Sequence, residues 1–305
     1  MLACKVLERL GIETTPICFE SYFFNCAKAR AAARALGVDL RVEDFSKEHL
    51  EIVRKPAHGR GAGVNPCIDC HLLMLKTAKK IMERERFDFI ATGEVLGQRS
   101  MSQNKLSLEI IERESGLTGK LLRPLSAKLL PETEIEKSGL VDRSRLGDIS
   151  GRSRQKQLAM AAEFGVKDIP QPAGGCILTE VEYGRHLREL AAIAPDFDAN
   201  DARILRQGRI FWEGGLLIAV ARDQNECAAL KNLAKTGDLV FEPQNFPGPA
   251  VLLRNFGQAS QVSQGETLRH LGERYVLRFS KKIPLHPEIS AKNKLLTFTN
   301  KKHNL

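Results

Sequence analysis

The sequence contains no long apolar run: none approaches the roughly 18 residues that a membrane-spanning helix requires. Its beginning lacks the charged, apolar and small-residue order of a secretory signal. It has neither an internal repeat nor a low-complexity tract. These absences argue against a membrane protein, an exported protein and a repeat array. We therefore expect a cytoplasmic protein with no membrane contact.

The composition is that of an ordinary globular protein. With 305 residues, 43% of them hydrophobic and 27% charged, the chain is long enough for one large or two ordinary domains. Lys and Arg number 46 and Asp and Glu 37, which gives a formal net charge of +9. This excess favours a polyanionic partner, and nucleic acid is the partner that we expect first.

Seven cysteines, an odd number without an export signal, favour reduced thiols over a disulfide framework. Cys67 and Cys70 form a CxxC pair, and a Gly-Gly-Cys sequence ends about a hundred residues later at Cys176. Three thiols placed in this way can hold a metal centre with one position open, which suggests chemistry. The remaining four have no ligand-like spacing, and we expect them to be small buried apolar residues: Cys4, Cys18, Cys26 and Cys227.

The first cysteine pair is expected to begin a helix. Asn65 is a good N-cap, Pro66 suits the first helical position, and apolar residues recur at helical spacing afterwards. Residues three apart share a helix face, and a helix N-terminus favours thiolates. The third thiol follows a turn-like stretch with two prolines and two glycines. A closed zinc site with His71 as fourth ligand, or three ordinary buried cysteines, remain alternatives.

Strands and helices are expected to alternate in the first part of the chain. The expected strands at residues 14–19, 39–45 and 87–92 are separated by helical patterns, which predicts a mostly parallel sheet covered on both faces. Ligands of such sheets bind beyond the carboxyl ends of the strands. The loop at residues 92–103 follows such an end and is small and polar, so it is a candidate nucleotide site.

Residues 122–157 are rich in Arg and Lys in a context of Gly and Ser. Such a stretch suits phosphate contacts, and a solvated surface loop is the alternative. The candidate RNA-binding residues here are Arg143, Arg145, Arg152, Arg154 and Lys156.

The chain changes character after residue 193, where an Asp-rich segment resembles a linker. We expect three parts: a first domain at 1–193, a small α+β domain at 194–283 that binds RNA, and a basic tail at 284–305. A two-residue turn at Gly214-Gly215 is expected to join two short strands. Four residues of the second domain are candidates for a stacking and phosphate-binding surface, with a core role as the alternative: Arg209, Phe211, Trp212 and Arg254.

Four segments, at residues 65–70, 91–99, 122–126 and 172–176, together resemble the tRNA thiouridine synthetases of the PP-loop ATP pyrophosphatase superfamily. The likeness spans roughly residues 1 to 190. It implies an α/β fold, the adenine nucleotide alpha hydrolase-like PP-loop parallel sheet with helices on both faces. Residues 238–253 look like an RNA-binding domain found in ribosome-associated quality-control proteins.

The resemblance also implies a reaction. In this family, ATP with Mg adenylates a uridine oxygen of tRNA, sulfur is inserted to give thiouridine, and AMP leaves. In the iron-sulfur branch three cysteines hold a 4Fe-4S cluster, and Cys67, Cys70 and Cys176 match them as catalytic and metal-binding residues. Branches without a cluster use two cysteines, one of which carries a persulfide.

Other site residues and partners follow from the same resemblance. Gly93, Glu94 and Gln98 would line the nucleotide site. Sulfur would come from sulfide or from a cysteine desulfurase, and the sequence leaves open whether the protein forms a homodimer.

One departure concerns the family's signature, a strand followed by SGGxDS that holds the ATP pyrophosphate. It is expected immediately before Met1 and is absent from the sequence. We therefore expect the 305-residue chain not to turn over ATP. Two alternatives to a tRNA sulfurtransferase are a non-catalytic RNA-binding protein with a metal-stiffened core and a different PP-loop enzyme that acts on a small molecule.

Overall fold

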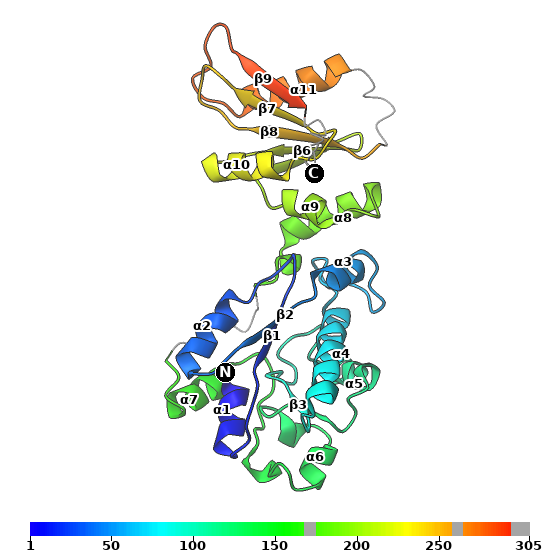
Figure 1. The fold of residues 1–305 in the computed structure, drawn as a ribbon, viewed down its shortest axis with the longest axis vertical. Coiled ribbons are helices and arrows are strands. Elements are labelled where there is room, and N and C mark those ends of the chain that lie inside the picture. The colour runs from blue at the N-terminus through cyan, green and yellow to red at the C-terminus, as the bar shows by residue number, and fades with distance from the viewer. Residues whose placement is uncertain (168–174, 258–264, 294–305) are drawn as a thin grey trace, which may run out of the picture. The chain divides into compact units, whose positions relative to one another are not determined.

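The computed structural model of the protein describes residues 1–167, 175–257 and 265–293. The chain divides into two compact units, Met1–Val181 and Glu182–Leu305 (Figure 1). Each unit is described by itself. Among the described residues no helix has the length and apolarity needed to cross a membrane.

The first unit consists of short strands connected by helices and long loops. Its strands have two to four residues, and its longest helix has 19. The elements in chain order are α1 (Leu2–Arg9), β1 (Ile17–Glu20), α2 (Ala27–Leu36), β2 (Arg41–Asp44), α3 (Ser46–Arg54), α4 (Cys67–Glu85), β3 (Ile90–Ala91), α5 (Lys105–Ser115), β4 (Leu121–Leu122), the 3-10 helix η1 (Ala127–Leu129), α6 (Glu134–Lys137), η2 (Arg143–Arg145), α7 (Gln155–Glu163) and η3 (Ile177–Thr179).

The strands of this unit form two separate parallel pairs. Strand β1 pairs with β2, and β3 pairs with β4. The predicted PP-loop sheet, an extended parallel sheet with helices on both faces, is therefore wrong for this chain. The physical reason is that β1 and β3 each have a strand neighbour on one edge only among the described residues, so the two pairs are not joined by hydrogen bonds.

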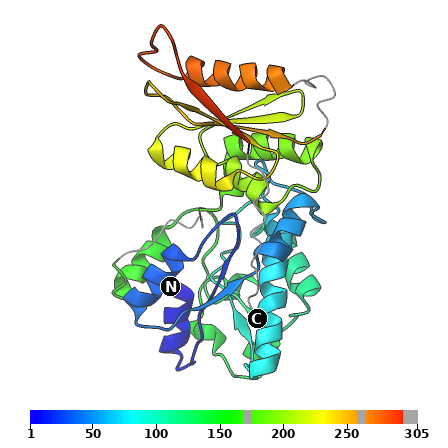
Figure 2. The same ribbon diagram turned by 45° about the horizontal axis from the view of Figure 1, so that its top comes forward.

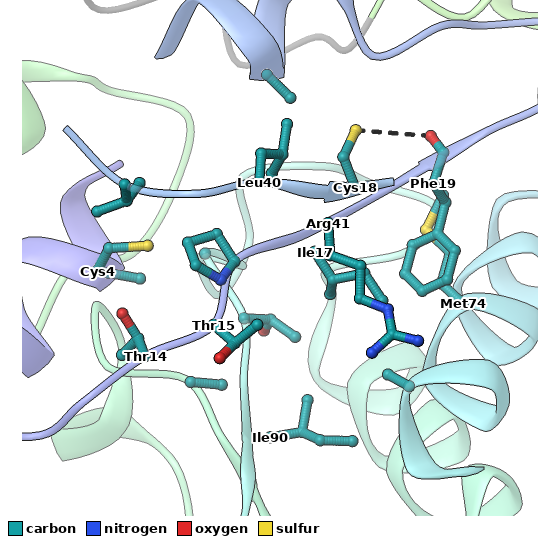
Figure 3. Close-up of a pocket in the computed structure, with 18 of the residues that line it drawn as sticks. Cys4, Thr14, Thr15, Ile17, Cys18, Phe19, Leu40, Arg41, Met74 and Ile90 are labelled. Atoms are coloured by element: carbon teal, nitrogen blue, oxygen red, sulfur yellow. Dashed lines mark hydrogen bonds between the residues drawn. The ribbon is translucent and has the colours of Figure 1, made fainter. Parts of the chain in front are cut away.

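A cavity of about 760 Å³ lies between the two pairs. Residues of both β1 and β3 line it, together with one side each of α1, α2 and α4. Figure 3 shows Ile17 and Phe19 of β1, Met74 of α4 and Ile90 of β3 around this space. Although β1 is rich in apolar residues, all four of its residues are only half-buried. In a continuous sheet, backbone hydrogen bonds would join the two strand pairs; here the cavity lies between them instead.

The core of the first unit lies beside the cavity. Leu2, Val6 and Leu7 of α1 pack against Leu122 of β4 and Ala161 of α7. On another side, α4 and α5 pack together through a smaller apolar cluster. These helices place the start of α4, which carries two of the cysteines, on a firmly packed element.

The second unit is built on a five-stranded antiparallel sheet with the strand order β5-β6-β8-β7-β9. Its elements are α8 (Val181–Ile193), α9 (Ala199–Ile204), β5 (Arg209–Glu213), β6 (Leu216–Val220), α10 (Gln224–Leu233), β7 (Leu239–Pro243), β8 (Val251–Asn255), α11 (Gly265–Arg278) and β9 (Ile289–Asn293). Figure 2 shows α11 on one face of this sheet and α10 on the other. The largest sheet that the described residues form is therefore antiparallel.

Local sequence explains the sheet of the second unit. Gly214 and Gly215 have φ values of 55° and 83°, as a two-residue hairpin turn between β5 and β6 requires. Strand β6 is buried along its whole length. Helix α11 approaches β7 closely at Gly272, where a Cβ would lie only 2.3 Å from the ring of Phe241. These features fix a compact apolar core under α11.

A buried ion-pair network joins the sheet to α9. Arg254 of β8 is only 4% exposed, and it donates to Asp238 at 2.6 Å and to Asp201 at 2.5 Å. The expectation that Arg254 contributes to an RNA surface is therefore wrong, because its guanidinium lies inside the protein. Its charge is used to neutralise two buried carboxylates.

Replacing Arg254 with Ala should lower the free energy of unfolding by about 3–5 kcal/mol, because buried Asp238 loses its cationic partner and Asp201 keeps only Lys235. Urea unfolding measures this change. The matched control is Arg274→Ala, since Arg274 pairs with Glu213 at 3.1 Å with 63% of its side chain exposed, and that change should cost about 1 kcal/mol or less. Equal effects of the two substitutions would contradict the structural role of Arg254.

Candidate metal centre

Cys67 and Cys70 lie in the first turn of α4, as the sequence predicted, but the helix start differs in detail. The N-cap is Pro66 and the helix begins at Cys67. Asn65 does not cap the helix: its side-chain amide donates to the Sγ of Cys67 at 3.0 Å. The same amide lies 3.5 Å from the Sδ of Met101. Asn65 therefore orients one of the candidate metal ligands.

Cys176 is held beside this helix start by backbone hydrogen bonds. It directly precedes η3, and the carbonyl of Leu178 in η3 accepts from the backbone N–H of Val64 at 3.0 Å. The N–H of Ile177 donates to the carbonyl of Phe23 at 3.3 Å. Gly63 allows this close approach, because a Cβ there would lie 2.4 Å from the Leu178 oxygen. The turn is thus attached to segments far away in the sequence.

The glycine-rich turn before Cys176 is described only in part. Gly175 has a φ of 76°, in the left-handed region that favours glycine. The other predicted turn residues, Pro170, Pro172 and Gly174, lie outside the described residues.

The three thiols influence one another electrostatically. Burial, together with the charges of Cys176 and Cys67, raises the pKa of Cys70 well above its usual value. Burial likewise raises the pKa of Cys176 to about 11, with a further contribution from Cys67. The backbone contacts of η3 hold Cys176 near the start of α4, close enough for the thiols to influence one another's pKa. The expectation that the helix N-terminus favours thiolates is wrong for Cys70, because burial dominates.

The donor set suits a centre that prefers soft ligands. Thiolates are the typical ligands of zinc and of iron-sulfur clusters. Among residues 1–167, 175–257 and 265–293, no group of three or more His, Cys, Asp or Glu side chains is arranged to hold one metal ion. In a cluster each cysteine binds a different iron atom, so the ligands do not have to meet at one point. The three thiols thus fit a 4Fe-4S cluster in number and chemistry.

Glu94, predicted to line a nucleotide site, is engaged by the protein. Its carboxylate accepts hydrogen bonds from His71 Nδ1 at 2.8 Å, Thr92 Oγ1 at 3.0 Å and Arg123 Nε at 3.0 Å. Burial alone would raise its pKa, but His71 and Arg123 lower the pKa of Glu94 to about 2. Glu94 therefore stays ionised and fixes the ring of His71 next to Cys70.

The other two predicted nucleotide residues differ from each other. Gln98 donates its amide to Gln157 Oε1 at 3.2 Å. Gly93 lines the cavity and has open space where a side chain would lie. The three residues thus fit ATP only in part, since Gly93 leaves room while Glu94 and Gln98 are bonded to other residues. We derive no reaction step through ATP from them.

The predicted RNA-binding residues mostly hold the fold together. Arg143 donates to Glu136 at 2.6 Å, Arg145 donates to the carbonyl of Arg9, and Lys156 pairs with Asp148 at 2.9 Å. Arg152 is exposed, and Arg154 is half-buried at the start of α7. Three of the five side chains are thus engaged by other groups of the protein, so the basic stretch alone does not define a binding surface.

A disulfide that the sequence did not predict joins Cys18 of β1 to Cys26, the residue before α2. Their Cα atoms lie 6.2 Å apart. The expectation that these two cysteines are unpaired apolar residues is wrong. The only signal in the sequence was their position at the two ends of one strand-to-helix loop.

The sequence matches no protein-family model, and no curated protein matches it. Among solved structures, the chain is similar to the C-terminal part of the fibronectin/fibrinogen-binding protein from Streptococcus suis, with 12% identity over 74% of this chain and 83% of that chain. The TM-score is 0.24, which is too low to support an argument about fold or function.

Because Glu94 is ionised in the folded protein, the free energy of unfolding should depend on pH in the acidic range. Its pKa in the folded protein, about 2, lies below the ordinary value of 4.5, so its contribution is present above pH 4.5 and is lost as the pH falls towards 2. The difference in free energy of unfolding between the wild type and Glu94→Gln should therefore shrink over this range. Urea unfolding at a series of pH values measures it. Glu109→Gln, the same substitution at an exposed position, is the control for the change of side chain itself. A constant difference for Glu94→Gln would contradict the assignment.

Proposed function

We propose that the protein is a tRNA sulfurtransferase that inserts sulfur into a uridine to give thiouridine. The observation that carries this proposal is the convergence of Cys67, Cys70 and Cys176 from two distant segments. The resemblance to tRNA thiouridine synthetases rests on these same cysteines, and it supplies the reaction. ATP with Mg is the activating substrate in that reaction, and sulfide or a cysteine desulfurase is the sulfur source.

Each cysteine has a distinct setting that serves metal binding. Asn65 holds the thiol of Cys67 through a hydrogen bond. Cys70 is buried and Cys176 half-buried, and this burial raises the pKa of both thiols and keeps them protonated at neutral pH until a metal displaces the protons. When bound, a 4Fe-4S cluster on the three cysteines supplies an iron with an open position for sulfide.

A cluster of arginines and aromatic rings on β5 and α11 supports an RNA partner. The guanidinium of Arg209 lies 5.2 Å from the ring centre of Phe279, and that of Arg278 lies 5.4 Å from Phe279 and 5.9 Å from Phe211. Both arginines are exposed. Exposed cations beside aromatic rings suit single-stranded RNA, whose phosphates and bases they contact. The net charge of +9 also favours binding to a polyanion such as RNA.

Anaerobic reconstitution with iron and sulfide should give a brown protein with about four iron atoms per chain. Cys176→Ala should abolish the colour, because one of the three ligands is lost. Cys227→Ala is the matched control, since Cys227 is a free thiol of the second unit and should leave the spectrum unchanged. Visible absorption and iron analysis are the measurements.

A colourless protein with one zinc per chain would contradict this proposal. It would favour the alternative of a non-catalytic RNA-binding protein with a metal-stiffened core. A coloured protein that binds no tRNA would reject the sulfurtransferase while retaining the cluster. Thionucleoside formed from tRNA, ATP and sulfide would instead overturn the expectation that the 305-residue chain does not turn over ATP.

Binding of tRNA should depend on the arginines of the second unit. Replacing both Arg209 and Arg278 with Ala should weaken binding and reduce its salt dependence by about 1–2 in the log-log slope, because up to two phosphate contacts are lost. Arg185→Ala on α8 is the control, since Arg185 is also exposed but lies outside the aromatic cluster. Filter binding at several salt concentrations measures the effect, and an unchanged slope would argue against this surface.

A further inference from the structure

The disulfide between Cys18 and Cys26 closes a short loop in the first unit. Cys18 lies in β1, and Cys26 immediately precedes α2, at a sequence separation of 8. The bond therefore fixes both ends of the segment 19–25. Neither residue belongs to the three-thiol centre.

The sulfur atoms of Cys18 and Cys26 differ in how accessible they are to a reagent in the cavity. Cys18 is half-buried and lines the 760 Å³ cavity (Figure 3). Cys26 is only 1% exposed. A small thiol that enters the cavity would therefore meet Cys18 first, and Cys26 would be the leaving group.

The loop closed by this bond also holds the turn that carries Cys176. Phe23, near the middle of the loop, is 2% exposed, and its ring contacts the ring of His49 with 5.6 Å between the centres. Its carbonyl accepts the hydrogen bond from Ile177, the residue after Cys176. A change in the position of Phe23 would therefore be transmitted to Cys176 through one hydrogen bond.

A second contact connects the same elements. Gly175 approaches Lys28 in the first turn of α2, and a Cβ at Gly175 would lie 3.5 Å from the Nζ of Lys28. Helix α2 starts directly after Cys26, so the disulfide also anchors this helix end. The loop and the helix thus both contact the turn around Cys176.

We propose that Cys18 and Cys26 form a thiol–disulfide exchange site whose redox state controls access to Cys176. In the oxidised form the closed loop holds the turn of Cys176, whose side chain is then half-buried. In the reduced form the loop is released and Cys176 becomes more accessible. A disulfide in the reducing compartment that the sequence predicts is typically transient and redox-sensing, which agrees with this role.

The exchange needs a small thiol as reductant. Its thiolate attacks the Sγ of Cys18, the bond to Cys26 breaks, and the Cys26 sulfur leaves as a thiolate that takes up a proton. A second molecule of the thiol attacks the mixed disulfide and releases Cys18 as a thiol. Two electrons pass to the protein, and the two reductant molecules become joined in one disulfide. The proposal does not depend on which metal the three-thiol centre binds.

The test compares alkylation of Cys176 in the full chain before and after reduction with glutathione, after removal of metal with a chelator. Mass spectrometry of the peptide that contains Cys176 gives the rate of iodoacetamide modification. We expect at least a fivefold faster reaction in the reduced protein. The variant with Cys18→Ser and Cys26→Ser should react at the fast rate with or without glutathione.

Cys4→Ser is the matched control, because Cys4 lines the same cavity without a disulfide, and this variant should keep the full response to glutathione.

Amide hydrogen exchange shows whether the double variant is folded. If the double variant is not folded, a glutathione redox titration of the wild type tests the proposal instead. Reduction of the Cys18–Cys26 bond and the increase in the alkylation rate of Cys176 should then occur at the same glutathione redox potential. Equal rates at Cys176 in both redox states, or alkylation of Cys18 and Cys26 before reduction, would overturn the proposal.

Discussion

The candidate site depends on two backbone hydrogen bonds that attach the Cys176 turn to the rest of the first unit. One joins Val64 to Leu178, directly before the helix with the cysteine pair, and the other joins Ile177 to Phe23. Each connects segments more than a hundred positions apart. Because backbone groups buried without partners are costly, these bonds determine where the third thiol lies. All of the chemistry considered for this protein requires that location.

Buried charge explains why several residues that look functional in the sequence have structural roles. Glu94, Arg123 and Arg254 are all less than 7% exposed, and each is bound to oppositely charged or polar partners. Ionised groups can be buried only when neutralised in this way, so their hydrogen-bonding capacity is already used. A polar residue after a strand is therefore ambiguous in the sequence, because the same position suits a ligand or an internal ion pair.

The local features of the site could be predicted from the sequence, whereas the pairing of strands could not. The start of α4 at the CxxC pair follows from helical spacing, and the hairpin at Gly214-Gly215 follows from turn chemistry. Alternation of strands and helices predicted a continuous parallel sheet, but periodicity does not specify which strands are neighbours. The Cys18–Cys26 bond was missed for a similar reason: the separation of two residues in space depends on the course of the loop between them.

Burial of the thiols has an energetic consequence that links the fold to the chemistry. Burial of Cys70 and Cys176 disfavours their thiolates, so a metal at the proposed centre would have to displace protons that the fold helps to retain. The affinity of such a centre for metal would therefore rise with pH. The bound cation would compensate the thiolate charges whose burial is costly, so the same packing would oppose an empty, ionised centre and favour an occupied one.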